Sequence, residues 1–400
     1  MAGLRNITLL ALAAATAHAD TSVTKELRAF VDAPPPAVFP SDLTAADPRI
    51  RSLFFEGAPY RGKPTRVFAW LGVPKRKENE KVPGIVLLHG GGGTAFESWV
   101  QLWVDRGYAA IAIDHFGNLP LPADADPRPR NPDGGPLGGS KAFSQLGEPL
   151  TDQWPYQAVS AAILAHSLLR AESGVGAERT GVTGISWGGY LSCVMAGLDQ
   201  RLKFAVPVYG CGHYRETTFA AALDKLPADQ RALWYDTWDA SHYIPGIRAP
   251  TLWVNGPNDK YFWLPAWQKS HRQMPAGLST ASLRLGMKHG SPPAGDPPEV
   301  MAFAESVVRG SRGLLRIIGT RRDGHSVRVE FDTSAGLSGA DLVYTSDTRS
   351  PWEKRLWQTV PARITGAEIQ AEVPVDALLY YVALRDEHGM TITTDYEELP

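Results

Sequence analysis

The sequence has little cysteine and no pattern of metal ligands. Only two cysteines, Cys193 and Cys211, occur among the 400 residues. Cys193 falls within a predicted helix and Cys211 follows a predicted strand, so a disulfide and two buried free thiols both remain open. No group of histidines and cysteines has the spacing of a zinc site. We therefore expect no metal and no cofactor.

Charge of one sign is also scarce. The formal net charge is −2. The longest basic run, "PKRKENEK" at residues 74–81, mixes both signs and is typical of an exposed turn. The composition argues against nucleic acid as a partner. It leaves the oligomeric state open.

The sequence lacks an apolar run long enough to span a bilayer. The apolar segment nearest to this length covers residues 7–17, which is too short for a transmembrane helix. Arg5 precedes it, and Ala-His-Ala at residues 17–19 offers a cleavage site. This pattern predicts a secretory signal peptide over residues 1–19 and a periplasmic or secreted protein. A cytosolic N-terminal helix is the alternative.

Two different periodicities divide the rest of the chain. From residue 51 to about residue 309, buried strands alternate with helices, which predicts an α/β fold with a mostly parallel, doubly wound sheet. Beyond residue 311, about seven short strands follow with a period of two, as in a small immunoglobulin- or fibronectin-like β-sandwich. We expect a catalytic domain over residues 20–310 and an accessory domain over residues 311–400.

Two long segments, residues 115–153 and 211–249, interrupt the alternation. Both leave from the C-terminal ends of strands, where open α/β sheets form their ligand crevice. They are candidate walls of an active site, although the first, rich in proline and glycine, also fits a disordered surface loop. Trp154, Trp234 and Trp238 lie in or beside these segments and could stack on sugar rings, with core packing as the alternative.

The stretch "TGISWGGY" at residues 183–190 places one serine between two glycines. Ser186 follows a short buried strand and precedes a helix. At a sharp strand-to-helix turn the backbone of such a serine is strained and its hydroxyl is presented, and the glycines avoid collisions with the crossing chain. This context predicts that Ser186 is a nucleophile rather than a serine in a glycine-rich turn.

A serine nucleophile needs a base and an acid, which follow it along the chain when it lies on such a turn. His289, in "GMKHGSPP", comes just after the last core strand, and we expect it to be the base. Asp259, in "NGPND", follows the preceding strand and is the expected acid. Glu216 is the reserve candidate for the acid, and His213 and His242 could also face the site.

Four consecutive glycines follow an early strand in "LLHGGGG". Without side chains, this main chain can approach a substrate closely. We expect the oxyanion hole to use a backbone N–H from Gly91 or Gly92 together with that of Trp187. A phosphate-binding loop is disfavoured because no Gly-Lys-Ser/Thr follows, and the spacing does not match a dinucleotide fingerprint.

Together, "LLHGGGG", "GISWGGY", "NGPND" and "KHG" resemble the α/β-hydrolase superfamily over about residues 50–309. The branch that the chain resembles most is that of exported acetylxylan esterases and dienelactone-hydrolase-like proteins, and the Ser-Trp-Gly-Gly-Tyr turn is also similar to that of prolyl oligopeptidases. A dienelactone hydrolase proper has a cysteine nucleophile, whereas this chain has Ser186.

The resemblance implies an exported serine carboxylester hydrolase that removes acetyl or other small acyl groups from a small-molecule or polysaccharide ester. A prolyl-oligopeptidase-like peptidase is a second hypothesis, but only the 64 residues 20–83 precede the strand that leads into the glycine loop, too few for a large propeller. A non-enzymatic binding protein on a hydrolase scaffold is a third, and it is disfavoured because no member of the triad is missing.

Overall fold

The computed structural model describes residues 22–120, 128–292, 295–332 and 336–400. The predicted signal peptide, residues 1–19, lies outside the described residues. Within the described part of the chain, no helix is long and apolar enough to cross a membrane.

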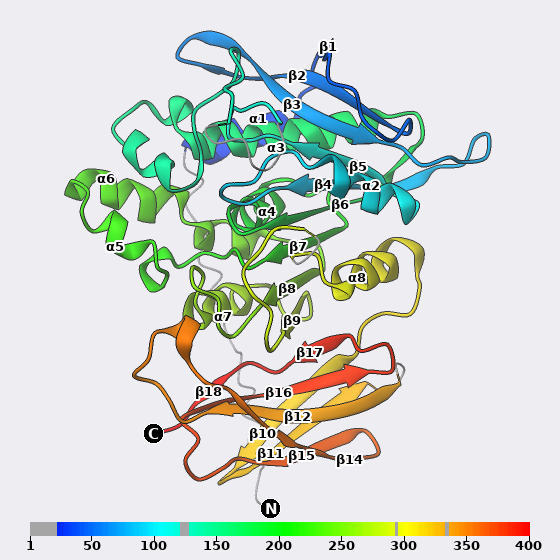
Figure 1. Cartoon of the computed structure of the whole chain (residues 1–400). Coiled ribbons are helices and arrows are strands. Elements are labelled where there is room, and N and C mark those ends of the chain that lie inside the picture. The colour runs from blue at the N-terminus through cyan, green and yellow to red at the C-terminus, as the bar shows by residue number, and fades with distance from the viewer. Residues whose placement is uncertain (1–21, 121–127, 293–294, 333–335) are drawn as a thin grey trace, which may run out of the picture.

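The chain forms an α/β part built on one large sheet and, below it in Figure 1, a β-sandwich. The large sheet has nine strands in the order β1-β2-β3-β5-β4-β6-β7-β8-β9. All pairs from β5 to β9 in this order are parallel, whereas β1, β2 and β3 pair antiparallel at one edge. The strands are β1 (Val38–Pro40), β2 (Ile50–Tyr60), β3 (Lys63–Gly72), β4 (Val82–Leu88), β5 (Ala109–Ile113), β6 (Val175–Ile185), β7 (Phe204–Val208), β8 (Thr251–Asn255) and β9 (Ser279–Leu283). The predicted mostly parallel sheet is confirmed.

Helices cover both faces of this sheet. Helices α2 and α8 lie on one face, and α3 and α4 lie on the other, with α1 packed against α3 and α4. Because both faces are covered, central strands such as β4, with the sequence "VPGIVLL", are buried at every position. The helices are α1 (Ser22–Asp32), α2 (Glu97–Asp105), α3 (Trp154–Ala171), α4 (Trp187–Leu198), α7 (Leu264–Arg272) and α8 (Pro298–Arg309).

The two long segments that interrupt the alternation fold into short helical turns. The described part of the first contains two 3-10 turns, η1 (Gly139–Gln145) and η2 (Leu150–Asp152). The second is a compact series consisting of η3 (Tyr214–Glu216), α5 (Ala220–Leu223), α6 (Ala228–Leu233), η4 (Trp234–Trp238), η5 (Ala240–His242) and η6 (Ile244–Gly246). Both segments send large apolar side chains into the main core, so they are packed parts of the fold.

Two antiparallel sheets face each other in the sandwich, which confirms the predicted second architecture. One has the order β10-β11-β15-β14, and the other has the order β13-β12-β16-β17, with β18 also paired to β16. The strands are β10 (Arg316–Asp323), β11 (Ser326–Asp332), β12 (Leu337–Thr345), β13 (Gln358–Pro361), β14 (Arg363–Thr365), β15 (Glu368–Glu372), β16 (Leu379–Asp386), β17 (Thr391–Thr393) and β18 (Glu397–Glu398). A short 3-10 turn, η7 (Trp352–Lys354), lies between β12 and β13.

Strand β16 is buried on both faces, which explains why its sequence "LYYVALRD" does not alternate. Tyr380 and Val382 point into the core between the two sheets of the sandwich. Tyr381 and Ala383, on the opposite face, belong to the same apolar cluster as the α/β part. The two parts therefore share a hydrophobic core, and the domain boundary near residue 310 stays a prediction.

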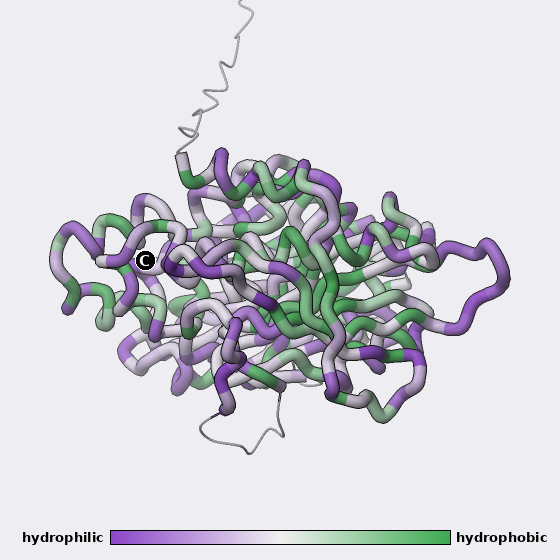
Figure 2. The backbone as a smooth tube through the Cα atoms, turned by 90° about the horizontal axis from the view of Figure 1, so that it is seen from above, coloured by the Kyte–Doolittle hydropathy of each residue, from purple (hydrophilic) through white to green (hydrophobic). Residues whose placement is uncertain are grey.

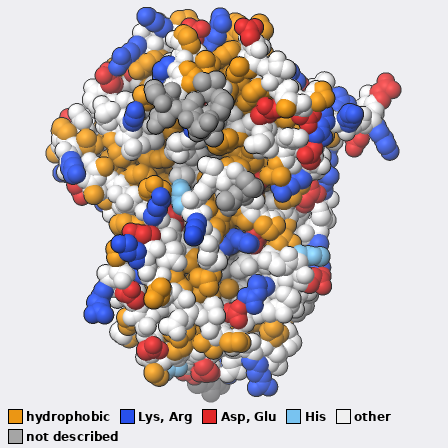
Figure 3. Space-filling model, in the orientation of Figure 1, with side chains coloured by type: hydrophobic (Ala, Val, Ile, Leu, Met, Phe, Trp, Pro, Cys, Tyr) orange, Lys and Arg blue, Asp and Glu red, His pale blue; other side chains and the backbone are white. Residues whose placement is uncertain are grey.

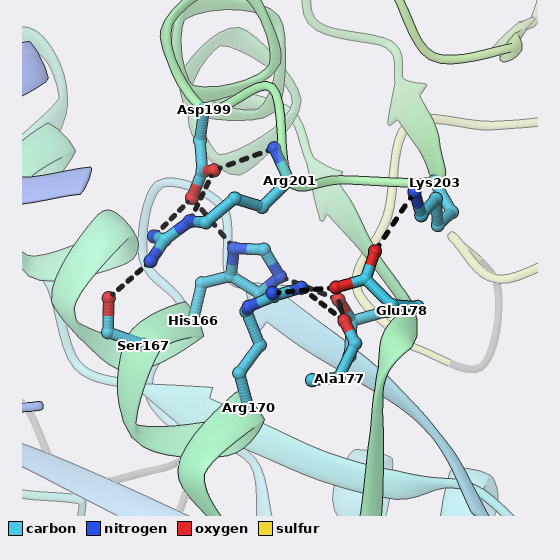
Figure 4. A network of polar contacts seen from close by, with 9 residues as sticks. His166, Ser167, Arg170, Ala177, Glu178, Asp199, Arg201 and Lys203 are labelled. Atoms are coloured by element: carbon cyan, nitrogen blue, oxygen red, sulfur yellow. Dashed lines mark hydrogen bonds and ion pairs between the residues drawn. The ribbon is translucent and has the colours of Figure 1, made fainter. Parts of the chain in front are cut away.

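A second Asp–His pair lies in the core, far along the chain from the predicted triad. His166 of α3 is completely buried, with Nδ1 2.7 Å from Oδ2 of Asp199 and Nε2 2.8 Å from Oγ1 of Thr180 in β6 (Figure 4). Arg201 also binds Asp199 and reaches the hydroxyl of Ser167. Burial lowers the pKa of His166, which keeps the imidazole neutral. The network joins α3, β6 and the end of α4.

Hydrophobic and hydrophilic segments are separated as expected for a globular chain. Seen from above, the hydrophobic segments gather in the middle and the hydrophilic ones at the rim (Figure 2). Residues 75–81 of the mixed basic run are all exposed. On the face in Figure 3, basic side chains are interspersed with acidic ones. Cys193 and Cys211 are buried free thiols, so the structure contains no disulfide between them.

Replacing Tyr381 by alanine should destabilise both parts of the chain together. Tyr381 is 0% exposed, and deleting a buried aromatic side chain costs about 3–5 kcal/mol of unfolding free energy. Urea unfolding followed by hydrogen exchange should show one shifted transition in both parts. Val375→Ala, at a position that is 90% exposed, is the control and should change stability by less than about 0.5 kcal/mol. Destabilisation of the sandwich alone would contradict the shared core.

Candidate active site

Ser186 lies at the strand-to-helix turn between β6 and α4. Its backbone has φ 60° and ψ −114°, a conformation that non-glycine residues rarely adopt. The turn is held from both sides: the N–H of Ser186 donates to the carbonyl of Val208 at 2.9 Å, and its own carbonyl accepts from the N–H of Tyr190 at 2.9 Å. The side chain is buried but not sealed, since the residue is 6% exposed.

The glycines around Ser186 allow α4 to approach the sheet. A Cβ on Gly188 would lie 1.9 Å from the carbonyl oxygen of Leu88, and a Cβ on Gly184 would lie 2.2 Å from the carbonyl oxygen of Gly188. Both neighbours are backbone and cannot move aside. Any side chain at these two positions would therefore push the helix off the strands and change the turn at Ser186.

Asp259 and His289 contact each other at the same edge of the sheet. Nδ1 of His289 lies 2.5 Å from Oδ2 of Asp259. The other oxygen, Oδ1, accepts the backbone N–H groups of Tyr261 and Phe262 at 2.8 and 2.7 Å. Asp259 is 2% exposed, so the carboxylate is fixed by its own turn and aimed at the imidazole. We call residues 256–262 the acid turn.

Close backbone packing holds the acid turn against the loop that carries His289. A Cβ on Gly256 would lie 2.2 Å from the carbonyl oxygen of Met287. The hydroxyl of Tyr209, just after β7, donates to the carbonyl of Lys288 at 2.8 Å, and its ring lies 4.3 Å from that of His289. The residue before Tyr209 accepts the hydrogen bond from Ser186. The ends of β6, β7, β8 and β9 thus bring the serine, the acid and the histidine to one side of the sheet.

The four-glycine loop lies against the turn of Ser186. A Cβ on Gly90 would lie 3.1 Å from Cβ of Ser186, and a Cβ on Gly91 would lie 3.0 Å from the indole Cδ1 of Trp187. Gly92 has φ +68°. The two glycines expected in the oxyanion hole are exposed, so their backbone is open to a bound group, whereas Trp187 is 4% exposed.

Two histidines under the glycine loop were not predicted as site residues. His89 and His115 stack with ring centroids 4.0 Å apart, and both are buried. Nδ1 of His89 lies 2.9 Å from the carbonyl oxygen of Gly90, and Nε2 of His115 lies 3.0 Å from the carbonyl oxygen of His89. Burial lowers the pKa of both imidazoles, so they are neutral. The available signal was that each follows the end of one of two adjacent parallel strands.

Trp154, Trp234 and Trp238 are each 0% exposed, which corrects the expectation that they stack on sugar rings. The indole of Trp154 donates to the carbonyl of His115 at 2.7 Å, and that of Trp238 donates to the side chain of Gln153 at 2.7 Å. Trp234 packs in the same aromatic cluster. The protein itself covers the three rings, so no face is left for a ligand.

The reserve candidates have other partners. Glu216 forms an ion pair with Lys269. Nε2 of His213 lies 3.1 Å from the side-chain oxygen of Gln273, and Nε2 of His242 contacts a backbone carbonyl. None of these contacts leads to the acid turn. Among the described residues, no three histidine, cysteine, aspartate or glutamate side chains are grouped so that they could hold a metal ion.

A family model of acetyl xylan esterases, AXE1, matches residues 22–225, just over half of the chain. The chain belongs to the acetyl xylan esterase (AXE1) family. As a member of this family it is a serine esterase, a hydrolase that acts on acetyl esters. The match includes the glycine loop and the Ser186 turn and ends before Asp259. No curated protein matches the sequence.

Solved acetyl xylan esterases share the fold of this AXE1-family protein. The enzyme from Paenibacillus sp. R4 is 21% identical, with a TM-score of 0.56 over 71% of this chain and 93% of that chain. Acetyl xylan esterase 1 from Thermoanaerobacterium sp. JW/SL YS485 is 15% identical, with a TM-score of 0.51 over 67% and 89% of the two chains. At these identities the similarity establishes the α/β-hydrolase fold.

A buried carboxyl lies a few residues beyond His289 in this AXE1-family protein. Asp296 is 7% exposed, and its Oδ2 accepts the indole N–H of Trp99 at 3.2 Å. Nη1 of Arg106 lies 3.7 Å away. Burial raises the pKa of Asp296 from its usual 3.8 to about 6, and Arg106 and Trp99 offset only part of this effect.

Replacing Asp296 by asparagine should make the protein relatively more stable as the pH rises. The folded state binds the Asp296 proton more tightly than the unfolded state, so the wild type loses stability between about pH 4 and pH 6. The loss is about 3 kcal/mol at 1.36 kcal/mol per pKa unit. Urea unfolding at pH 4 and pH 7 should show the advantage of the variant growing by up to this amount. An equal pH dependence of the two proteins would contradict the assignment.

Proposed function

We propose that this esterase uses Ser186 as nucleophile, His289 as general base and Asp259 as the orienting acid to remove acetyl groups from carbohydrate esters. The observation that carries the proposal is the 2.5 Å contact between His289 and Asp259 at the sheet edge where Ser186 occupies its strained turn. The serine lies on the strand-to-helix turn that presents a hydroxyl, and the glycine loop lies against it.

In the proposed reaction, His289 takes the proton of the Ser186 hydroxyl as its oxygen attacks the ester carbonyl. The negative oxygen that forms is bound by the backbone N–H groups of Gly91 or Gly92 and of Trp187. The imidazolium then returns the proton to the leaving alcohol, and an acyl-serine remains. Water, deprotonated by His289, attacks this ester and releases the acid. Asp259 holds the imidazole orientation and stabilises its charged form throughout.

A short acyl group fits the surroundings of Ser186 best. The indole of Trp187 is enclosed by other aromatic rings, including Phe219 at a centroid distance of 4.8 Å and Phe143 at 5.9 Å. Gly91 already contacts this indole. The side of the turn next to the oxyanion loop is thus filled by protein. A carbohydrate alcohol is supported by the family to which the chain belongs.

Export and a two-domain organisation complete the proposal. Residues 1–19 have the pattern of a cleavable signal peptide, so we propose a periplasmic or secreted enzyme. We propose that residues 20–310 form the catalytic domain and that residues 311–400 form an accessory domain. The separate apolar core of the sandwich supports this division, although the two parts also share a cluster.

Ser186→Ala should abolish ester hydrolysis and labelling by a fluorophosphonate while the protein stays folded, because only one hydroxyl is lost. Asp259→Asn should lower kcat by about 10⁴, because a neutral amide stabilises neither the right tautomer nor the imidazolium. Hydrolysis of p-nitrophenyl acetate and circular dichroism measure both effects.

Two matched controls accompany these variants. Ser160→Ala removes another buried serine hydroxyl, on α3, and should leave activity unchanged. Glu216→Gln neutralises the reserve acid and should also have little effect. If Glu216→Gln lowers kcat more than Asp259→Asn does, the acid is misassigned. Turnover by a pure Ser186→Ala preparation would overturn the nucleophile.

The rate should fall as the acyl chain of p-nitrophenyl esters lengthens from acetate to octanoate. An apolar pocket that accepted the chain would add about 0.8 kcal/mol of binding per methylene, so rates would then rise steeply. An acetylated polysaccharide should release acetate. A rising slope would indicate a lipase-like esterase, and efficient cleavage of a prolyl amide would favour the peptidase hypothesis.

A further inference from the structure

The residue before the proposed acid contacts the β-sandwich. The side-chain amide of Asn258 donates two hydrogen bonds, to the carbonyl oxygen of Trp352 at 3.0 Å and to that of Arg355 at 2.8 Å. These carbonyls lie 94 and 97 residues away along the chain. One half-buried side chain thus joins the acid turn to the loop between β12 and β13, residues 346–357, which we call the β12–β13 loop.

The β12–β13 loop is organised before it meets the acid turn. Arg355 lies over the ring of Trp352 at 3.6 Å, and its guanidinium donates to the carbonyls of Ser350 and Thr348, both at 3.1 Å. Oδ1 of Asp347 accepts the backbone N–H of Ser350 at 3.0 Å. Contacts within the loop therefore hold the two carbonyls that receive Asn258 in position.

The loop is also fixed to the rest of the molecule. Trp352 packs against the cluster shared by the two parts, and its ring lies 6.3 Å from that of Tyr396. Tyr396 in turn exchanges two backbone hydrogen bonds with the side chain of Gln268 on α7, at 3.0 and 2.7 Å. The sandwich thus presents a rigid surface to the acid turn.

On the other side of Asn258, the acid turn transmits its position to the imidazole. Asp259 takes its orientation from the backbone N–H groups of Tyr261 and Phe262, so displacing the turn displaces the carboxylate. The carboxylate contacts His289 at 2.5 Å. A shift of about 1 Å at a catalytic group can cost about 100-fold in rate.

We propose that Asn258 is a positioning residue and that the β12–β13 loop of the sandwich sets the place of the proposed acid. The inference rests on the proposed triad and assigns the sandwich a part in catalysis: it orients the acid without touching the substrate. Asparagine suits this role because its amide has two donors, which two fixed carbonyls can satisfy at once.

Asn258→Ala should lower kcat for p-nitrophenyl acetate about tenfold or more and change KM less than about twofold, because the acid is displaced while the substrate site is untouched. In the Asp259→Asn background, the same substitution should lower kcat less than about twofold, since it acts through the carboxylate that is already lost. A role in stability alone would not produce this dependence on Asp259.

Gln268→Ala is the matched control. It removes an amide that also makes two backbone hydrogen bonds across the same interface, but on α7 and away from the acid turn. It should lower the Tm and leave kcat within about twofold. If Asn258→Ala does not fold, Arg355→Ala gives the same test from the sandwich side, with the same dependence on Asp259.

The inference is overturned if Asn258→Ala or, in its place, Arg355→Ala keeps the wild-type kcat. It is also overturned if the loss in kcat is equal with and without Asp259→Asn, or if Gln268→Ala lowers kcat as much. Failure of the triad itself is read separately, from turnover by Ser186→Ala or from full activity of Asp259→Asn.

Discussion

The approach of α4 to the sheet is the constraint on which the arrangement of the site depends. Gly188 lies so close to the carbonyl of Leu88 that a side chain would meet the backbone at 1.9 Å. A helix at this distance can follow β6 only through a sharp turn, and Ser186 takes that turn at φ 60°. The glycine loop after β4 and the chain after β7 then lie against the same turn, because β4, β6 and β7 are neighbours in the sheet.

The far side of the site is assembled from β8, β9 and the sandwich. Strand β9 is the last of the sheet, where backbone groups and apolar side chains would otherwise be open to solvent. Strand β17 of the sandwich lies beside it, and the side chain of Thr393 accepts the N–H of Leu283 at 3.3 Å. The same contact surface continues to Asn258. Covering a sheet edge and holding the acid turn are therefore two results of one docking.

The features predicted from sequence are those with a strong local signal. Strands buried on both faces, such as β4, are continuous apolar runs, and the order of strands and helices followed from them. The turn of Ser186 and the pairing of Asp259 with His289 were expected from their positions just after strands. The edge strand β2 and helix α1 were not predicted, because their patterns are weaker. The tryptophans were misjudged because composition does not tell whether an aromatic face meets solvent or core.

The sequence by itself determined the fold class, the family resemblance and the local chemistry of each turn, because periodicity and glycine spacing act over a few residues. The tertiary structure decided how those turns are supported. His89 and His115 meet under the glycine loop only because β4 and β5 are adjacent and parallel. Asn258 finds its two carbonyls only because the sandwich docks on the sheet edge. Contacts between residues so distant in the chain depend on how whole elements pack, and no local pattern records that packing.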